Sequence, residues 1–289
     1  MLRHHNSAPS MPKRAVVVGG GGFVGRAIVN ALRAKGCETD AVLKSEIDLL
    51  AEDAPQRLAA RIQDGDALIL VSFPAPARTH QAMLDALRMT AAMIDAIKGR
   101  KLAQLVAISS DAVYASALSR IDERTCRQPD SFHGMAHAAR ELMLAQAASA
   151  PFAVLRPCLI YGAKDPHNGY GPNRFMRLAE AGKPITLSGQ GEELRDHIFI
   201  EDVAELAALS ALWRSSGSLN LATGHSVSFA EVAQILSGLM PGRVRIETQP
   251  RTQPVTYRHF SVEERIKAFP DFQPTPLALG LSHVVKEGR

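Results

Sequence analysis

The sequence is poor in cysteine and contains no long hydrophobic run. Its 289 residues include three cysteines, Cys37, Cys126 and Cys158, without a Cys-x-x-Cys pair, which argues against a disulfide framework or a zinc site and favours a reducing compartment. No stretch reaches the roughly 18 consecutive apolar residues that a membrane span requires. Residues 1–12 are polar and lack the apolar core of a secretory signal, so we predict a disordered tail, no membrane contact and a cytoplasmic location.

The basic residues also form no cluster along the chain. Lysine and arginine number 33 against 29 acidic residues, for a net charge of +4, but they are scattered. A nucleic-acid interface would need a basic stripe with interleaved aromatic residues, so we predict no nucleic-acid partner. The mild positive balance suits an anionic small ligand.

Short apolar runs alternate with helical patterns through the first half of the chain. Strand-like runs lie at residues 15–18, 40–43, 67–73, 105–109 and 152–155, and helical patterns at 23–35, 54–63, 79–97 and 134–148. This alternation predicts an α/β fold, a Rossmann-type doubly wound parallel sheet over residues 13–156. Glycine, proline and asparagine are dense beyond residue 157, which predicts a smaller C-terminal substrate-binding region over 157–289, with the chain free to cross between the halves.

Glycines follow the first predicted strand at a regular spacing. Gly19, Gly22 and Gly25 form a G-x-x-G-x-x-G pattern that opens the first helix with Phe23 and Val24. Glycines permit a tight turn, a close approach of the backbone to a pyrophosphate and close packing of the helix on the strand. Because a strand precedes the pattern and a helix follows it, we predict that these five residues bind a dinucleotide.

The end of the second predicted strand bears on the choice of cofactor. Lys44 and Ser45 follow this strand, and Glu46 comes next. An acidic residue here would bind the 2′-hydroxyl of NAD, whereas a basic residue suits the 2′-phosphate of NADP. Lys44 therefore favours NADP, with NAD still possible.

Four motifs together resemble the extended short-chain dehydrogenase/reductase family, the NAD-dependent epimerases, dehydratases and reductases of nucleotide-sugars. They are the glycine loop, the run Ile108–Tyr114, the run Arg156–Gly162 and the run Arg195–Ile198. The similarity covers roughly residues 13–285. The segment 45–49 is also similar to the third-strand region of dTDP-4-dehydrorhamnose reductases, and the resemblance implies that Asp48 lies by the adenine.

The resemblance implies a role for several further residues. Ser110 matches the residue that bonds the reacting sugar oxygen, and Asp111 stands where the 4,6-dehydratases of the family carry an acid. Ala112 replaces the glutamate that follows in dehydratases, which speaks against that activity.

The implied substrate contacts lie further along the chain. Arg195 matches the arginine that binds the nucleotide diphosphate or its ribose, with a fork geometry suited to phosphate oxygens. Asn168 and Asn173 stand in the loop that supplies substrate contacts. The helix over 79–97 commonly pairs subunits in this family, so the resemblance also implies a homodimer.

The sequence departs from the family at its catalytic Tyr-x-x-x-Lys signature. His133 stands at the tyrosine position and His137 at the lysine position. Histidine titrates near neutrality without a cationic helper, so His133 is a chemically coherent acid/base. His137 lies one helical turn further on the same face, where a ring nitrogen could bond the ribose of the cofactor.

Three interpretations remain open for this histidine pair. In the first, His133 transfers the proton while hydride moves between NAD(P) and a nucleotide-sugar, in a reduction or an epimerisation, with Ser110 orienting the reacting oxygen. In the second, the site is silent and the protein is an NADP- or nucleotide-sugar-binding subunit, sensor or scaffold. In the third, both histidines ligate a metal. Because neither an HExxH motif nor a third ligand accompanies them, we predict no metal. Tyr114 and Tyr161 are nearby candidates for a displaced phenol, although structural roles suit both better.

Overall fold

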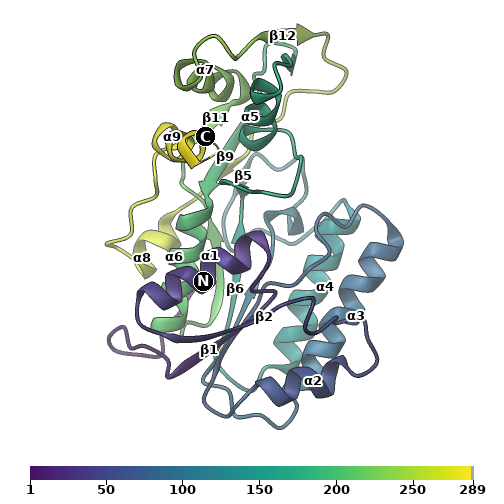
Figure 1. The fold of residues 1–289 in the computed structure, drawn as a ribbon, viewed down its shortest axis with the longest axis vertical. Helices are drawn as coiled ribbons and strands as arrows, with labels where there is room; N and C mark the ends of the chain where they lie inside the picture. The colour runs from purple at the N-terminus through teal and green to yellow at the C-terminus, as the bar shows by residue number, and fades with distance from the viewer. Residues whose placement is uncertain (288–289) are drawn as a thin grey trace.

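A parallel six-stranded sheet forms the centre of the molecule in the computed structural model, which describes residues 1–287 (Figure 1). Its strands are β1 (Arg14–Val18), β2 (Glu38–Val42), β3 (Ala67–Leu70), β4 (Gln104–Ile108), β6 (Phe152–Pro157) and β10 (Gly217–Leu221). They lie in the order β10-β6-β4-β3-β1-β2, and every adjacent pair is parallel. Apolar runs such as β3 and β4 are buried along their whole length, as expected for strands covered on both faces. The predicted fold class is confirmed.

Helices cover both faces of this sheet. One face carries α1 (Phe23–Ala34) and α6 (Ile200–Leu212), which share a core with the sheet. The other face carries α2 (Ala54–Arg61), α3 (His80–Ile97) and α4 (Phe132–Ala147) over a second core. None of the helices within residues 1–287 combines the length and apolarity that crossing a bilayer would require.

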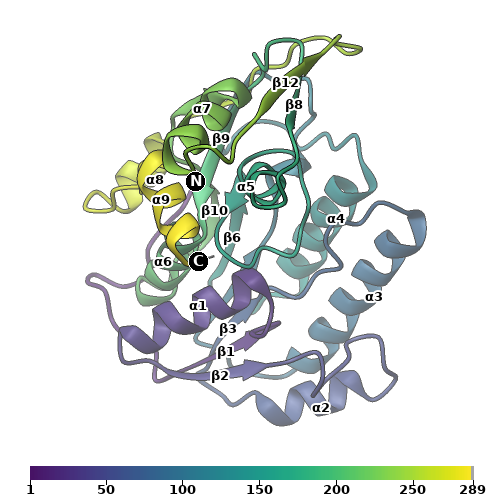
Figure 2. The ribbon, with the colours of Figure 1, turned by 45° about the horizontal axis from the view of Figure 1, so that its top comes forward.

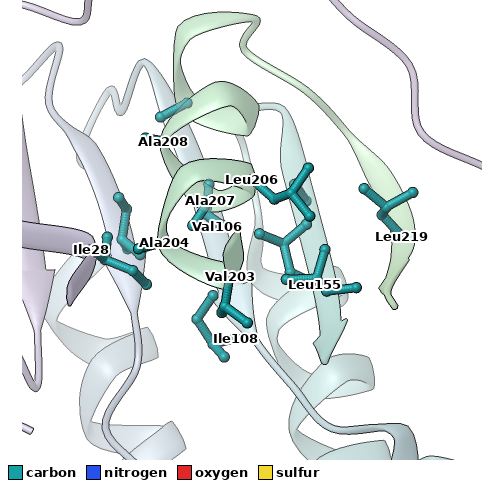
Figure 3. Close-up of a cluster of buried hydrophobic side chains, with 14 of the residues drawn as sticks. Ile28, Val106, Ile108, Leu155, Val203, Ala204, Leu206, Ala207, Ala208 and Leu219 are labelled. Carbon is teal, nitrogen blue, oxygen red and sulfur yellow. The ribbon is translucent and has the colours of Figure 1, made fainter. Parts of the chain in front are cut away.

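Small side chains bring α6 close to the sheet. Val203, Ala204 and Ala207 are fully or almost fully buried. Figure 3 shows Val203 beside Ile108 of the sheet and Ala204 beside Ile28 of α1. Alanines allow the helix axis to approach the strands closely while the longer residues fill the remaining space. The chain leaves the large sheet after β6 and returns to it through α6 and β10.

The C-terminal half has its own core beyond one end of the large sheet (Figure 2). Phe175, Phe229 and Leu236 lie at its centre. Its strands form the sheets β11-β9-β7 and β12-β8. The elements are β7 (Leu159–Tyr161), α5 (Pro172–Glu180), β8 (Ile185–Ser188), β9 (Leu194–Phe199), β11 (Ser226–Ser228), α7 (Phe229–Leu239), β12 (Ile246–Gln249) and α9 (Leu277–Glu287). Shorter connecting elements are η1 (Asp111–Val113), β5 (Arg120–Ile121), β13 (His259–Phe260) and α8 (Glu263–Ala268).

The N-terminal segment, predicted to be a disordered tail, contacts distant parts of the chain. Arg3 exchanges two backbone hydrogen bonds of 2.8 Å with Ser216. The His4 ring stacks on Trp213 with centroids 4.7 Å apart, and its Nε2 lies 2.9 Å from the carbonyl oxygen of Ala268. These contacts anchor residues that the sequence presents only as polar. They depend on partners more than 200 positions away, which local composition does not reveal.

Candidate functional site

A cavity of about 1160 Å³ lies at the carboxyl ends of β1, β2, β3, β4 and β6. Its walls include the loop that follows each of these strands, and they continue into the segment 165–173 of the C-terminal half. The strand order reverses at β1, which has β2 on one side and β3 on the other. A ligand crevice at the carboxyl edge of an open α/β sheet forms where the order reverses.

The glycine loop forms one end of this cavity, and its geometry requires glycine. Gly19 has φ +90°, and a Cβ on it would lie 2.6 Å from Oγ of Ser72. A Cβ on Gly25 would lie 2.0 Å from the carbonyl oxygen of Gly19. Gly22 precedes α1 and has no side chain to cap the first amides, which are the groups that bind an anion at a helix N-terminus. Together with Phe23 and Val24 in the walls, the loop suits the pyrophosphate of a dinucleotide.

The residues predicted to surround the adenosine part also line the cavity. Lys44, Ser45 and Asp48 are in its walls. They lie in a turn between β2 and α2, so the segment 45–49 is not part of a third strand. The Glu46 carboxylate accepts a 2.9 Å hydrogen bond from the Leu43 amide. The acidic side chain closest in sequence to Lys44 is therefore already engaged by the backbone.

His133 and His137 both lie on α4 and face the cavity with Phe73. Their rings are 4.7 Å apart and nearly perpendicular, and Phe73 stacks on His137 at 3.8 Å. The His133 Nδ1 accepts a 3.3 Å hydrogen bond from the Ala77 amide, so the neutral ring carries its proton on Nε2. Burial lowers the pKa of His133, and the charge of His167 adds to the effect. The pKa of His137 lies well below its usual value because of burial and the nearby charges of His133 and Arg140.

Arg140 fixes α4 beneath the histidine pair. It is almost completely buried, and its guanidinium donates to the carbonyl oxygens of Ile108 at 2.6 Å and Leu70 at 2.9 Å. These carbonyls are at the carboxyl ends of β4 and β3. Burial lowers the pKa of Arg140 to about 10, so the group stays cationic at neutral pH and helps to keep His137 neutral.

Ser110 and Asp111 lie next to the histidine pair, where η1 meets α4. A Cβ on Gly134 would lie 2.0 Å from the carbonyl oxygen of Ala112, so this glycine permits the close approach. Ser110 Oγ accepts a 3.1 Å hydrogen bond from the Ala112 amide. Burial raises the pKa of Asp111, while the Arg258 guanidinium, 3.2 Å away, opposes this shift.

The predicted substrate contacts in the C-terminal half lie in differing surroundings. Asn168 and Arg195 are absent from the cavity walls formed by residues 1–287. The Arg195 guanidinium instead donates to Thr256 Oγ1 at 2.6 Å. Asn173 does line the cavity, but its Oδ1 accepts from the Gly162 amide at 3.2 Å and its Nδ2 donates to Asp165 at 2.8 Å. The side-chain amide of Asn173 therefore supports the wall.

Neither candidate for a displaced phenol reaches the cavity. The Tyr114 hydroxyl donates to Asn220 Oδ1 at 2.8 Å and accepts from Arg156 Nη1 at 2.8 Å. Burial raises the pKa of Tyr161, whose hydroxyl oxygen would lie 2.0 Å from a Cβ on Gly280 of α9. Both tyrosines are about 1% exposed and have structural surroundings.

Besides Phe73, one tyrosine and two histidines of the wall were not predicted as site residues. His167, Tyr170 and His197 all line the cavity. The only signal for His197 was its place in the run Arg195–Ile198, where alternation puts it on the same face of the strand as Arg195. In residues 1–287, no three His, Cys, Asp or Glu side chains lie close enough together to hold a metal ion.

Known proteins with similar sequences and folds agree with this architecture. Residues 15–222 match the model of the NAD dependent epimerase/dehydratase family. A dTDP-4-dehydro-6-deoxy-D-allose reductase from Streptomyces bikiniensis is 24% identical, with 95% of each chain covered. UDP-glucose 4-epimerase of Thermus thermophilus, in complex with NAD, has a TM-score of 0.81 at 21% identity and covers 94% of this chain and 98% of its own. A GDP-L-fucose synthetase from Naegleria fowleri bound to NADP has a TM-score of 0.81 at 16% identity, covering 98% and 96%. The chain belongs to the NAD dependent epimerase/dehydratase family.

Proposed function

We propose that this protein is an NAD(P)-dependent oxidoreductase or epimerase of a nucleotide-sugar, with NADP as the preferred cofactor. One observation carries the proposal: a single cavity joins the glycine loop, the pair Ser110 and His133, and the walls of the C-terminal half. When bound, the nicotinamide would supply or accept a hydride at a sugar carbon. Lys44 in the wall supports NADP by its charge. The sequence similarity to a dTDP-sugar reductase supports the substrate class.

The residues around the reacting oxygen have separate roles in this proposal. The Ser110 hydroxyl orients the sugar oxygen by donating a hydrogen bond, and His133 transfers the proton at Nε2. A doubly protonated His133 ring is required to give up a proton, so the Ala77 amide must release Nδ1 in that state. His137 stays neutral and is placed to bond the cofactor ribose, and Asp111 balances the charge of Arg258 beside the site.

The hydrogen bond from the Ala77 amide to His133 favours a second candidate function. The Ala77 amide holds His133 in the neutral form with a proton already on Nε2, and burial lowers its pKa. In that state the ring can donate a hydrogen bond to an oxygen but is a poor proton donor or acceptor. These features suit a subunit, sensor or scaffold that binds NADP or a nucleotide-sugar without turnover.

Titration followed by a turnover assay separates the two candidates. Native mass spectrometry with NADP(H), NAD(H) and a panel of UDP-, dTDP- and GDP-sugars would show which ligands bind. We expect joint binding of NADP and one nucleotide-sugar, followed by reduction or epimerisation. Joint binding without turnover from pH 5 to 9 would establish the silent protein. Failure to bind any nucleotide-sugar would contradict the proposed substrate class.

We also propose that the protein is a cytoplasmic homodimer. Its three cysteines are all free thiols, as in proteins of a reducing compartment. The adjacent helices α3 and α4 expose Leu84, Phe132, Met135 and Leu142, each at least 42% accessible. An apolar face of this kind on two packed helices is typical of a subunit contact.

A further inference from the structure

His197 is a buried side chain of the cavity wall without a partner. It lies on β9, is 3% exposed, and lines the cavity. Neither of its ring nitrogens finds a hydrogen-bond partner within residues 1–287. Burying polar atoms without partners costs free energy, and native proteins rarely leave them so unless something else supplies the bond.

The surroundings of His197 direct it toward the substrate end of the cavity. Its Cε1 would lie 3.5 Å from a Cβ on Gly171, whose φ is +137°. The Phe229 ring stands edge-on at 6.0 Å, and Tyr170 packs against Phe229 at 4.6 Å. These residues belong to β9, α7 and the loop before α5, which lie together in Figure 2. These neighbours of His197 all belong to the C-terminal half, and none of them is a predicted cofactor-binding residue.

The charge state of His197 limits what it can bind. Burial, together with the charge of Arg195, lowers the pKa of His197 to about 3. The ring is therefore neutral at physiological pH, with one nitrogen that donates and one that accepts. The neutral His197 ring cannot form an ion pair with a phosphate. A hydroxyl or an amide-like group, which can both donate and accept, matches it.

We propose that His197 determines substrate specificity by forming a hydrogen bond to a neutral polar group of the nucleotide-sugar, either a sugar hydroxyl or the amide-like edge of the base. This inference rests on the proposed function, because it assumes that a nucleotide-sugar enters this end of the cavity. It assigns a binding role to a residue outside the Ser110 and His133 pair.

The test compares His197→Phe with the wild-type protein in calorimetric titrations at saturating NADP. Each nucleotide-sugar that binds the wild type is used as one probe, and the matching nucleoside diphosphate, UDP, dTDP or GDP, as the other. We expect roughly tenfold weaker binding of the nucleotide-sugar, the scale of one lost hydrogen bond in a buried site. NADP affinity should stay within about twofold. A loss with both probes identifies the base as the partner, and a loss with the nucleotide-sugar alone identifies the sugar.

Two further variants separate hydrogen bonding from shape. His197→Gln keeps a neutral donor and acceptor and should recover much of the affinity, whereas equal losses in the Phe and Gln variants would overturn the proposal. His225→Phe makes the same change at an exposed site outside the cavity and should bind like the wild type. If His197→Phe does not fold, His197→Met carries the same test.

The outcomes also separate this inference from the proposed function. Equal nucleotide-sugar affinities in the wild type and His197→Phe would overturn the role of His197 alone. A wild-type protein that binds NADP but no nucleotide-sugar would overturn both proposals.

Discussion

His133, His137 and His197 in the cavity owe the direction of their pKa shifts to burial more than to any acidic partner. Burial is the largest cause of the lowered pKa at His133, His137 and His197, and Arg140 and Arg195 add positive charge nearby. Histidine was expected to titrate near 6.5, as it does unaided. At these three positions burial instead favours the neutral ring. The environment of each residue therefore decides what the His-x-x-x-His substitution can do chemically.

The first prediction at the residue scale concerns His133. His133→Ala should abolish turnover of the nucleotide-sugar, because the proposed proton carrier at the reacting oxygen is lost. NADP affinity should stay within about twofold, since the glycine loop is unchanged and one lost neutral hydrogen bond changes affinity only modestly. Steady-state kinetics and NADP titration measure the two effects. His80→Ala, at an exposed position at the start of α3, is the control, and unchanged turnover in His133→Ala would remove His133 from the mechanism.

The elements position the site by close backbone contacts that glycine permits. Gly25 brings α1 onto the loop after β1, and Gly134 brings α4 onto η1. The first contact shapes the predicted pyrophosphate end, and the second places the histidine pair beside Ser110. Two close contacts between a helix and the backbone of another segment thus position the glycine loop and the histidine pair. Neither contact could accommodate a Cβ on its glycine without a movement of the backbone.

A prediction at this scale compares two glycines in helices. Gly25→Ala places a Cβ 2.0 Å from the Gly19 carbonyl oxygen, so the loop must shift. We expect a loss of roughly 2–4 kcal/mol of unfolding free energy and NADP binding at least tenfold weaker. Gly238→Ala in α7, where a Cβ meets nothing within 4 Å, should stabilise the protein by about 0.5–1 kcal/mol. Urea unfolding and NADP titration measure both, and equal behaviour of the two variants would contradict the steric argument.

The stability of the whole molecule should depend on its neutral buried histidines. The folded-state pKa values of His137 and His197 are depressed, so their contribution is fully present above the unfolded value near 6.5. It is lost as the pH falls below about 6.5, and for His197 the loss continues toward its folded-state pKa of about 3, because the unfolded chain binds protons that the folded chain does not. Each histidine can remove up to about 1.4 kcal/mol per pH unit in that window.

Thermal or urea unfolding between pH 7.5 and 4.5 tests this dependence. The wild type should lose stability on acidification, and His197→Phe should lose less per pH unit, because one of the two groups is gone. Exposed His225→Phe serves as the control and should follow the wild type. Parallel pH profiles for the wild type and His197→Phe would show that His197 is protonated equally in both states.

A second prediction for the whole molecule concerns its assembly. Replacing Met135 and Leu142, exposed on α4, with glutamate should convert the proposed homodimer into a monomer, because charges would be buried in an apolar contact. Sedimentation velocity at micromolar concentration measures the change. Leu279→Glu, equally exposed on α9, should leave the dimer intact. A wild-type protein that sediments as a monomer would contradict the homodimer.

The sequence by itself determined the parallel sheet and the place of the glycine loop, because both follow from local patterns. Apolar runs predicted five strands of the large sheet, β1, β2, β3, β4 and β6, although the predicted run 67–73 is three residues too long. β3 ends at Leu70, and Val71 to Phe73 enter the cavity wall. The Phe73 ring faces the site beside the two histidines, and periodicity does not distinguish a side chain that faces a site from one that faces a core.

Only the tertiary structure decided the substrate side of the cavity and the state of its histidines. Arg195 and His197 lie on one strand face, yet Thr256 engages Arg195 while His197 remains unpaired in the described chain. The Ala77 amide that fixes the His133 ring, and the Trp213 ring that holds the N-terminal segment, come from distant parts of the sequence. Residues that come together only on folding determine the burial, the pKa values and the hydrogen bonds of these side chains. Local sequence patterns do not contain that information.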